Sequence, residues 1–246
     1  MDSQTILTIA LLMGLGAALY TAVGHAGASA YLAIMALFSV APATMKPTAL
    51  VLNILVATFT SFRFIRAGQF DLRLAWPFIA GAVPLAFLGG SIHLPGEAYR
   101  PLVGGVLLLA GVRLLWPRPL AKQAEIGRPP VWAALASGAG VGLLSGLTGT
   151  GGGIFLSPIL LFFGWALPRQ ASATAAVFIL CNSVAGLAGN LSSVGRLPAE
   201  LPYYIAAVAV GAVIGTSLGV RRLPAGRLLQ LLGVVLLIAG GKLIFT

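Results

Sequence analysis

Long runs without a charged residue are the feature that most restricts how this chain can fold. Most runs hold roughly 20 residues, the length that a helix needs to cross a hydrocarbon core of about 30 Å. Cutting the chain at proline, glycine and charged residues gives apolar segments at about 4–23, 28–40, 47–65, 74–92, 99–116, 131–148, 153–165, 171–193, 201–219 and 225–244. The runs are continuous and do not alternate with polar residues, so they predict an all-α membrane protein in a lipid bilayer.

Composition agrees with this class. Charged residues make up 8% of the chain, against about 25% in a soluble domain. The net charge of +10 does not imply a nucleic-acid partner, because the basic residues sit in short loops between apolar segments, where they set orientation. Cys181 is the sole cysteine, so no intramolecular disulfide can form. We expect no cofactor and no metal site.

The two halves of the chain resemble each other. Gly24-His-Ala-Gly-Ala28 falls 125 positions before Gly149-Thr-Gly-Gly-Gly153. Further matches join Pro42 to Pro168 and the stretch 94–116 to 223–245, in the same order. Three ordered matches indicate a duplication. We therefore predict a first transmembrane repeat over 1–116, a linker over 117–130 and a second repeat over 131–246.

The number of segments fixes the relation between the repeats. Five segments per half is an odd number, so the second repeat must be inverted relative to the first. The linker carries Arg118, Lys122 and Arg128, and most other arginines fall on its side of the membrane. By the positive-inside rule that side is the cytoplasm, which puts both termini on the outer side of the membrane.

Segments 28–40 and 153–165 are short. Thirteen helical residues rise about 20 Å, less than the thickness of the hydrocarbon core. Each short segment follows a glycine motif, so we expect broken or re-entrant helices there. Inverted repeats with such segments are typical of transporters, whose substrate binds near the midplane where the repeats meet.

The glycine motifs are candidate binding elements. Glycines let the backbone turn and approach a ligand closely, and the start of the next helix offers free N–H groups. No Asp or Glu lies inside any predicted segment, which disfavours a cation site and favours an anion. The predicted substrate-binding residues are Gly24, His25, Gly27, Ser29, Thr48, Asn53, Thr148, Gly149, Thr150, Gly151, Gly152, Gly153, Thr174 and Asn182.

Plainer interpretations compete at these positions. Glycines also serve close helix packing, Asn and Thr bond between helices, and Thr can bond its own helix backbone. His25 could attract an anion or relay a coupled proton, or be a neutral imidazole bonded to a carbonyl. If the glycines bind an anion, Gly152→Val should stop transport without unfolding the protein. Gly233, expected to face lipid, would tolerate substitution.

At these residues the chain resembles the sulfite exporter TauE/SafE family of membrane permeases. The resemblance rests on Gly149–Pro158, on the small-residue stretch Ala171–Thr174 and on the duplication, and it spans essentially the whole chain. The first copy departs from the motif at Ala26, Ala28 and Ala33. The resemblance implies an exporter of small sulfur-containing anions such as sulfite or organosulfonates.

Two other functions compete with this one. A passive anion channel needs the same donors without alternating access. An intramembrane enzyme needs a nucleophile–base pair or a metal cluster, and the two histidines, His25 and His93, lie on different segments. We therefore expect no enzyme activity.

Overall fold

A computed structural model describes residues 2–115, 127–220 and 226–245. Over these residues the protein is all-helical, without a strand. The α-helices are α1 (Ser3–Ala22), α2 (Ala28–Leu37), α3 (Pro42–Arg66), α4 (Leu72–Ser91), α5 (Gly96–Leu115), α6 (Val131–Thr148), α7 (Gly153–Phe162), α8 (Pro168–Gly189), α9 (Leu201–Val220) and α10 (Gly226–Phe245). A 3-10 helix, η1 (Leu191–Arg196), lies between α8 and α9.

Each of the ten predicted apolar segments corresponds to one α-helix. Among the described residues, six helices are long and apolar enough to cross a membrane: α1, α3, α4, α5, α6 and α8. The predicted linker falls mostly outside the described residues, because 117–126 are not among them, and neither are Arg221 and Arg222. Because several of its helices can each cross a membrane, the protein is a multi-pass helical membrane protein.

The largest boundary difference concerns the start of α3. The sequence places it near residue 47 because Pro47 reads as a breaker, whereas the helix begins at Pro42. Proline at the first helical position costs nothing, since that N–H has no intrahelical partner. Pro47 lies in the second turn, where it removes a single backbone hydrogen bond, and prolines are tolerated in membrane helices.

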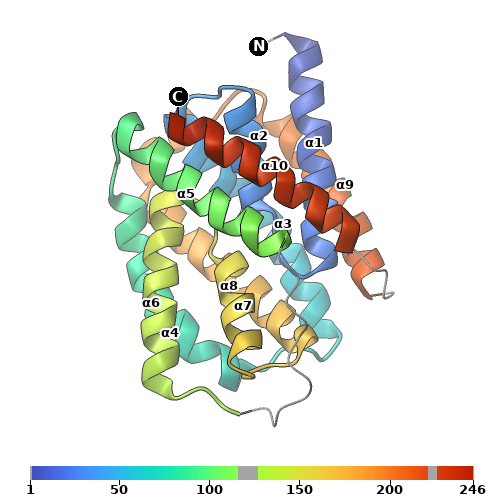
Figure 1. The fold of residues 1–246 in the computed structure, drawn as a ribbon, viewed down its shortest axis with the longest axis vertical. Coiled ribbons are helices and arrows are strands. Elements are labelled where there is room, and N and C mark those ends of the chain that lie inside the picture. The colour runs from blue at the N-terminus through green and yellow to red at the C-terminus, as the bar shows by residue number, and fades with distance from the viewer. Residues whose placement is uncertain (1, 116–126, 221–225, 246) are drawn as a thin grey trace.

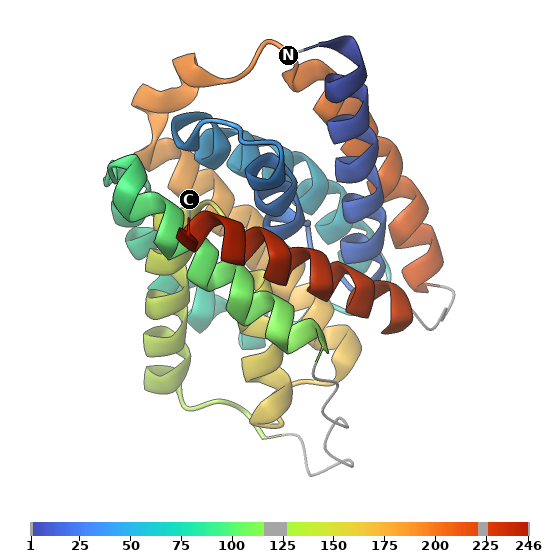
Figure 2. The same ribbon diagram turned by 45° about the horizontal axis from the view of Figure 1, so that its top comes forward.

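Helices from the two halves pack in pairs. α1 lies against α9, α6 against α4, and α5 against α10, while α3 and α8 pack together in the interior. Figures 1 and 2 both show α5 and α10 side by side, running obliquely across the molecule. Several of these contacts depend on glycine. A Cβ built on Gly142 of α6 would lie 2.4 Å from the Ala82 backbone oxygen of α4, and one on Gly211 of α9 would lie 2.1 Å from the Gly14 oxygen of α1.

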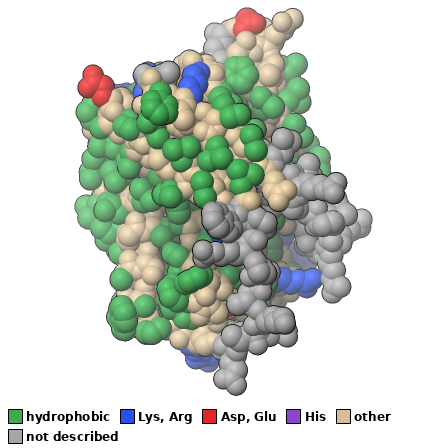
Figure 3. Space-filling model, in the orientation of Figure 1, with side chains coloured by type: hydrophobic (Ala, Val, Ile, Leu, Met, Phe, Trp, Pro, Cys, Tyr) green, Lys and Arg blue, Asp and Glu red, His purple; other side chains and the backbone are tan. Residues whose placement is uncertain are grey.

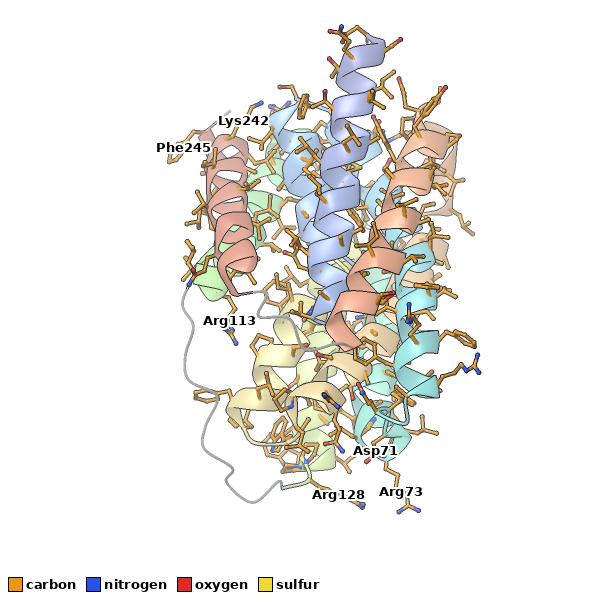
Figure 4. The ribbon with its side chains drawn as sticks, turned by 90° about the vertical axis from the view of Figure 1, so that its right-hand side faces the viewer. Asp71, Arg73, Arg113, Arg128, Lys242 and Phe245 are labelled. Atoms are coloured by element: carbon orange, nitrogen blue, oxygen red, sulfur yellow. The ribbon has the colours of Figure 1, made fainter. Side chains whose placement is uncertain are left out.

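The two ends of the molecule differ. The N- and C-termini lie at the same end (Figure 1). Figure 4 shows Lys242 and Phe245 near that end, and Asp71, Arg73 and Arg128 at the opposite one. We call these the terminus end and the arginine end. Hydrophobic side chains cover most of the visible face between them (Figure 3), as expected for a surface in lipid.

α2 and α7 hold ten residues each, about 15 Å of helix, so neither can cross the hydrocarbon core alone. Figure 1 shows α2 toward the terminus end and α7 toward the arginine end. Each follows a longer helix through a glycine turn. The short helices thus enter the interior from opposite ends, and their N-termini point toward the middle of the molecule.

Candidate functional site

Both glycine turns depend on left-handed backbone. Gly24 and Gly27 have φ of 83° and 101°, and Gly149, Gly151 and Gly152 have φ of 85°, 74° and 79°. Gly27 is the N-cap of α2, and Gly152 is the N-cap of α7. Other residues enter this region at a cost of roughly 1–2 kcal/mol each. The glycines therefore explain why the apolar chain breaks here instead of continuing as helix.

The two turns meet. His25 Nε2, from the first turn, lies 3.0 Å from the Gly153 carbonyl oxygen and 3.1 Å from Ser157 Oγ on α7. The imidazole thus links motifs that are more than 120 residues apart in the chain. This contact matches the plainer interpretation of His25, a ring bonded to a backbone carbonyl, and also places the ring beside the start of α7.

The two interior helices that pack together, α3 and α8, carry a set of buried polar residues. Thr48, Asn53, Thr174 and Asn182 are all 0% exposed. Within the described protein atoms, no hydrogen-bond partner lies near Thr48 Oγ1, Asn53 Oδ1, Thr174 Oγ1, Asn182 Nδ2 or Asn182 Oδ1. Buried polar groups are nearly always bonded, because leaving one unsatisfied costs about 1–3 kcal/mol. We refer to these four residues as the unpaired cluster.

The two threonines of the cluster are unlike other buried threonines of the chain. Thr21, Thr60 and Thr216 each donate to the carbonyl four residues earlier, at 2.7–2.8 Å. That local bond is how a threonine in a membrane helix usually satisfies its hydroxyl. Neither Thr48 nor Thr174 makes it. The backbone-bonding alternative is therefore wrong for these two positions.

The second glycine motif packs directly on the asparagines. A Cβ built on Gly151 would lie 2.5 Å from Asn53 Nδ2, and one on Gly152 would lie 3.3 Å from Asn182 Nδ2. Asn53 Nδ2 also lies 3.4 Å from Ser183 Oγ, a long contact. The first hydrogen bond of α7 runs from Phe155 N–H to the Gly152 oxygen, so the N–H groups of Gly153 and Ile154 precede it. Backbone N–H, amide and hydroxyl donors therefore converge here.

The remaining predicted residues already have partners. Thr148 Oγ1 bonds the Leu144 carbonyl and lies 3.0 Å from Thr150 Oγ1. Ser29 Oγ bonds the Tyr20 hydroxyl on α1. These groups lie beside the glycine turns and hold them in shape, whereas the unpaired cluster and His25 Nδ1 lack partners among the described atoms.

Sequence reasoning missed Ser183, Val141, Phe178 and Ile179, which pack against the glycine run. The apolar members carry no signal of their own in so hydrophobic a chain. Ser183 could have been found, since it follows Asn182 directly. The packing also bears on Gly233. It faces α5, not lipid, because its Cβ would lie 3.0 Å from Leu115 Cγ and 3.1 Å from the Gly111 oxygen, so the expectation for this residue was wrong.

No buried acidic side chain of the described residues offsets the backbone dipole at the site. In the described part of the chain, the buried polar and charged residues include no Asp or Glu. The same residues contain no group of three His, Cys, Asp or Glu side chains that could hold a metal ion. The positive end of the α7 dipole and uncharged donors suit an anion.

These features define a multi-pass helical membrane protein with a buried polar site between short, glycine-broken helices. A sequence profile of the sulfite exporter TauE/SafE family matches residues 9–243, and the chain belongs to that family. It is 41% identical to a "Probable membrane transporter protein y4hK" of Sinorhizobium fredii (strain NBRC 101917 / NGR234), over the full length of both chains. No solved structure matches. The protein is thus a membrane transporter and not an enzyme.

Proposed function

We propose that this protein is a secondary transporter that exports small sulfur-containing anions, such as sulfite or organosulfonates, across the bacterial inner membrane. The family to which it belongs is described as sulfite exporters. The substrate site is the unpaired cluster together with Gly151–Gly153 and the first N–H groups of α7.

The observation that carries the proposal is the set of buried donors without partners on α3 and α8, namely Thr48 Oγ1, Thr174 Oγ1 and Asn182 Nδ2. Sites that hold unpaired polar groups are unstable unless something else satisfies them. A pyramidal or tetrahedral oxyanion accepts several hydrogen bonds at once from N–H and O–H donors. Bonds to a charged acceptor contribute about 1.5–3 kcal/mol each, enough to offset the cost of leaving the donors unpaired in the empty protein.

The arrangement of the helices supports two inverted repeats, 1–116 and 131–246. The pairing of α1 with α9 has its counterpart in the pairing of α6 with α4. The turns follow the same rule. A Cβ on Gly24 would touch Ser172 of α8, and one on Gly149 would touch Lys46 of α3. Ser172 lies 126 positions after Lys46, so the two contacts correspond under the duplication. Related halves around one site are suited to alternating access.

The orientation follows from charge. Arg73 and Arg128 lie at the arginine end, with Arg63 and Arg66 in the last turn of α3 near it. By the positive-inside rule this end faces the cytoplasm, so both termini face the periplasm. Cys181 would be replaced by Ala and single cysteines placed at positions 2 and 128. A membrane-impermeant thiol reagent should then label position 2 in intact cells, and labelling of position 128 instead would reverse the orientation.

The function is tested with purified protein in liposomes against a panel of sulfite, ethanesulfonate, sulfate, a divalent metal cation and a neutral sugar. Saturable flux of sulfite or the sulfonate, with neither cation nor sugar flux, is expected. Counter-flow, in which unlabelled anion on one side drives labelled anion from the other, separates a carrier from a passive channel. Metal or sugar flux without anion flux contradicts the proposal.

A further inference from the structure

A cavity with basic residues in its walls lies at the terminus end, apart from the unpaired cluster. Its volume is about 420 Å³, within the range of small-molecule sites. It is bounded by the start of α3, the segment between α4 and α5, and the segment from the end of α8 into η1. Basic side chains line it from several elements, namely Lys46, His93, Arg100 and Arg196. None of its described lining residues is Asp or Glu.

Lys46 fixes a positive charge in the wall of this cavity. The residue is 7% exposed, and its ammonium donates to the carbonyls of Gly89, Gly90 and Ile92 at 3.1, 2.9 and 3.2 Å. An ammonium has three N–H groups, so these bonds use all of them. Lys46 therefore binds the C-terminal carbonyls of α4 and contributes charge, but no free donor, to a ligand.

Asn190 supplies a donor instead. It caps the C-terminus of α8, lines the cavity and is 1% exposed. Its Nδ2 has no hydrogen-bond partner among the described atoms. A buried amide N–H₂ without an acceptor, in a cavity of positive charge, lacks what an anion provides. His93 Nε2 contacts Ser192 Oγ and Ser193 Oγ of η1, at 3.0 and 3.2 Å. These contacts tie the segment between α4 and α5 to η1.

Three residues that line the cavity adjoin or contact the second glycine motif. Leu147 and Tyr99 line it, and the Tyr99 hydroxyl donates to the Thr148 carbonyl at 2.9 Å. Gly149 packs on the Lys46 backbone, where a Cβ would lie 3.1 Å from its oxygen. The wall of the cavity is thus also the wall of the turn that leads into α7.

We propose that this cavity is an anion-binding vestibule, which holds a small free oxyanion of the sulfite or sulfonate class on its way to or from the central site. The identity of the anion rests on the proposed function. Lys46, Arg100 and Arg196 attract the anion, and the Asn190 amide donates to it. A lipid headgroup phosphate shares this chemistry, but the contacts of the cavity wall with the glycine turn favour the transported anion.

The test measures binding of radiolabelled sulfite to the purified full-length chain in detergent. Wild-type protein should bind two sulfite ions per chain. Asn190→Leu, close in size, should lower affinity at one of the two sites about tenfold, because one hydrogen bond to a charged group is lost. Arg196→Gln, at an exposed position, should weaken the same site several-fold, with an effect that shrinks as salt rises. Arg128→Gln, exposed at the arginine end, is the matched control and should bind as wild type does.

Unchanged affinity and stoichiometry in both Asn190→Leu and Arg196→Gln would overturn the vestibule. So would native mass spectra in which phosphatidylglycerol remains on the wild type and is lost from both variants while sulfite binding is unaltered, since a lipid site would then be present. If sulfite binding depends on Asn190 but liposomes carry no sulfite flux, the vestibule stands and the transport proposal fails. Arg196→Gln keeps the test decisive should Asn190→Leu not fold.

Discussion

The turn between α1 and α2 and the turn between α6 and α7 are built alike but have different surroundings. In the first, Tyr31 fills the space beside Gly27, with its hydroxyl 2.6 Å from the Ala26 carbonyl oxygen. In the second, Val141, Phe178 and Asn182 lie beside the matching glycine, Gly152, and Asn53 lies beside Gly151. The amides of both asparagines retain unpaired atoms. Tyr31, from the helix that follows the first turn, therefore fills the space beside that turn. The second turn faces amide groups that a ligand could satisfy.

The residues that differ between the turns explain this contrast. His25 stands where Thr150 stands in the second copy. His25 reaches out to α7, whereas Thr150 bonds within its own turn to Thr148. The duplicated fold thus supplies two similar turns. We infer that the second turn binds the anion, while the first turn supports the second from the other side.

The largest effect is expected from Gly152→Val. The new Cβ would lie 2.7 Å from Val141 Cγ1 at a φ of 79°. Left-handed backbone costs about 1–2 kcal/mol, and overpacking adds about 1–3 kcal/mol. The melting temperature and the sulfite flux should both fall. The sequence alone, in contrast, predicts that the fold survives. Gly140→Val is the control, since that glycine has open space around it. A fully stable Gly152→Val protein would show that the close packing is not as described.

The next effect separates the unpaired threonines from a paired one. Thr48→Val and Thr174→Val keep shape and remove a hydroxyl that has no protein partner. Stability should be unchanged or higher, while the affinity for sulfite falls about tenfold, the loss of one hydrogen bond to a charged group. Thr60→Val, also buried on α3 but bonded to the Val56 carbonyl, should leave affinity unchanged. Equal sulfite affinities in all three variants would remove the distinction.

A smaller effect is expected from His25→Ala, which cuts the link between the two turns. Loss of the contacts with the Gly153 oxygen and Ser157 should lower the free energy of unfolding by about 0.5–1.5 kcal/mol per hydrogen bond. We expect reduced flux with a detectable shift in melting temperature. If His25 also relays the coupled proton, an imposed pH gradient will no longer drive anion accumulation. Unaltered melting temperature and flux would refute a bridging role.

The smallest effect should come from Tyr31→Phe in the first turn. The change removes one hydrogen bond, to the Ala26 carbonyl, worth about 1 kcal/mol of stability. Sulfite affinity should stay at the wild-type value, because the aromatic ring still fills the space beside Gly27. Weakened sulfite binding without any change in melting temperature would place substrate at the first turn and reverse the comparison.

Much of the fold could be predicted from the sequence, because the bilayer imposes length and continuity on each apolar run. All ten α-helices were expected near their observed positions, and the glycine breaks before α2 and α7 were located from composition. The 3-10 helix η1 (Leu191–Arg196) was not expected, since the predicted segment 171–193 includes its first half. Short irregular helices depend on local packing that residue patterns do not encode.

The site was predictable only in part. Thr48, Asn53, Thr174 and Asn182 stand out as polar residues in apolar segments, but the sequence cannot tell a paired side chain from an unpaired one. Thr60 and Thr174 look alike in the chain, and only the packing of α3 and α8 separates them. Likewise, the sequence does not reveal that the Lys46 ammonium donates hydrogen bonds to the carbonyls of α4.

The central claim is that the second turn and its asparagines bind the transported anion. Its most direct test is sulfite binding and melting temperature measured together for Asn182→Leu. Both amide atoms of Asn182 lack partners, so a leucine of similar size should keep or raise the melting temperature, while affinity at the central site falls at least tenfold. Wild-type affinity in a stable variant, or a loss of binding that merely follows a loss of stability, would contradict the claim.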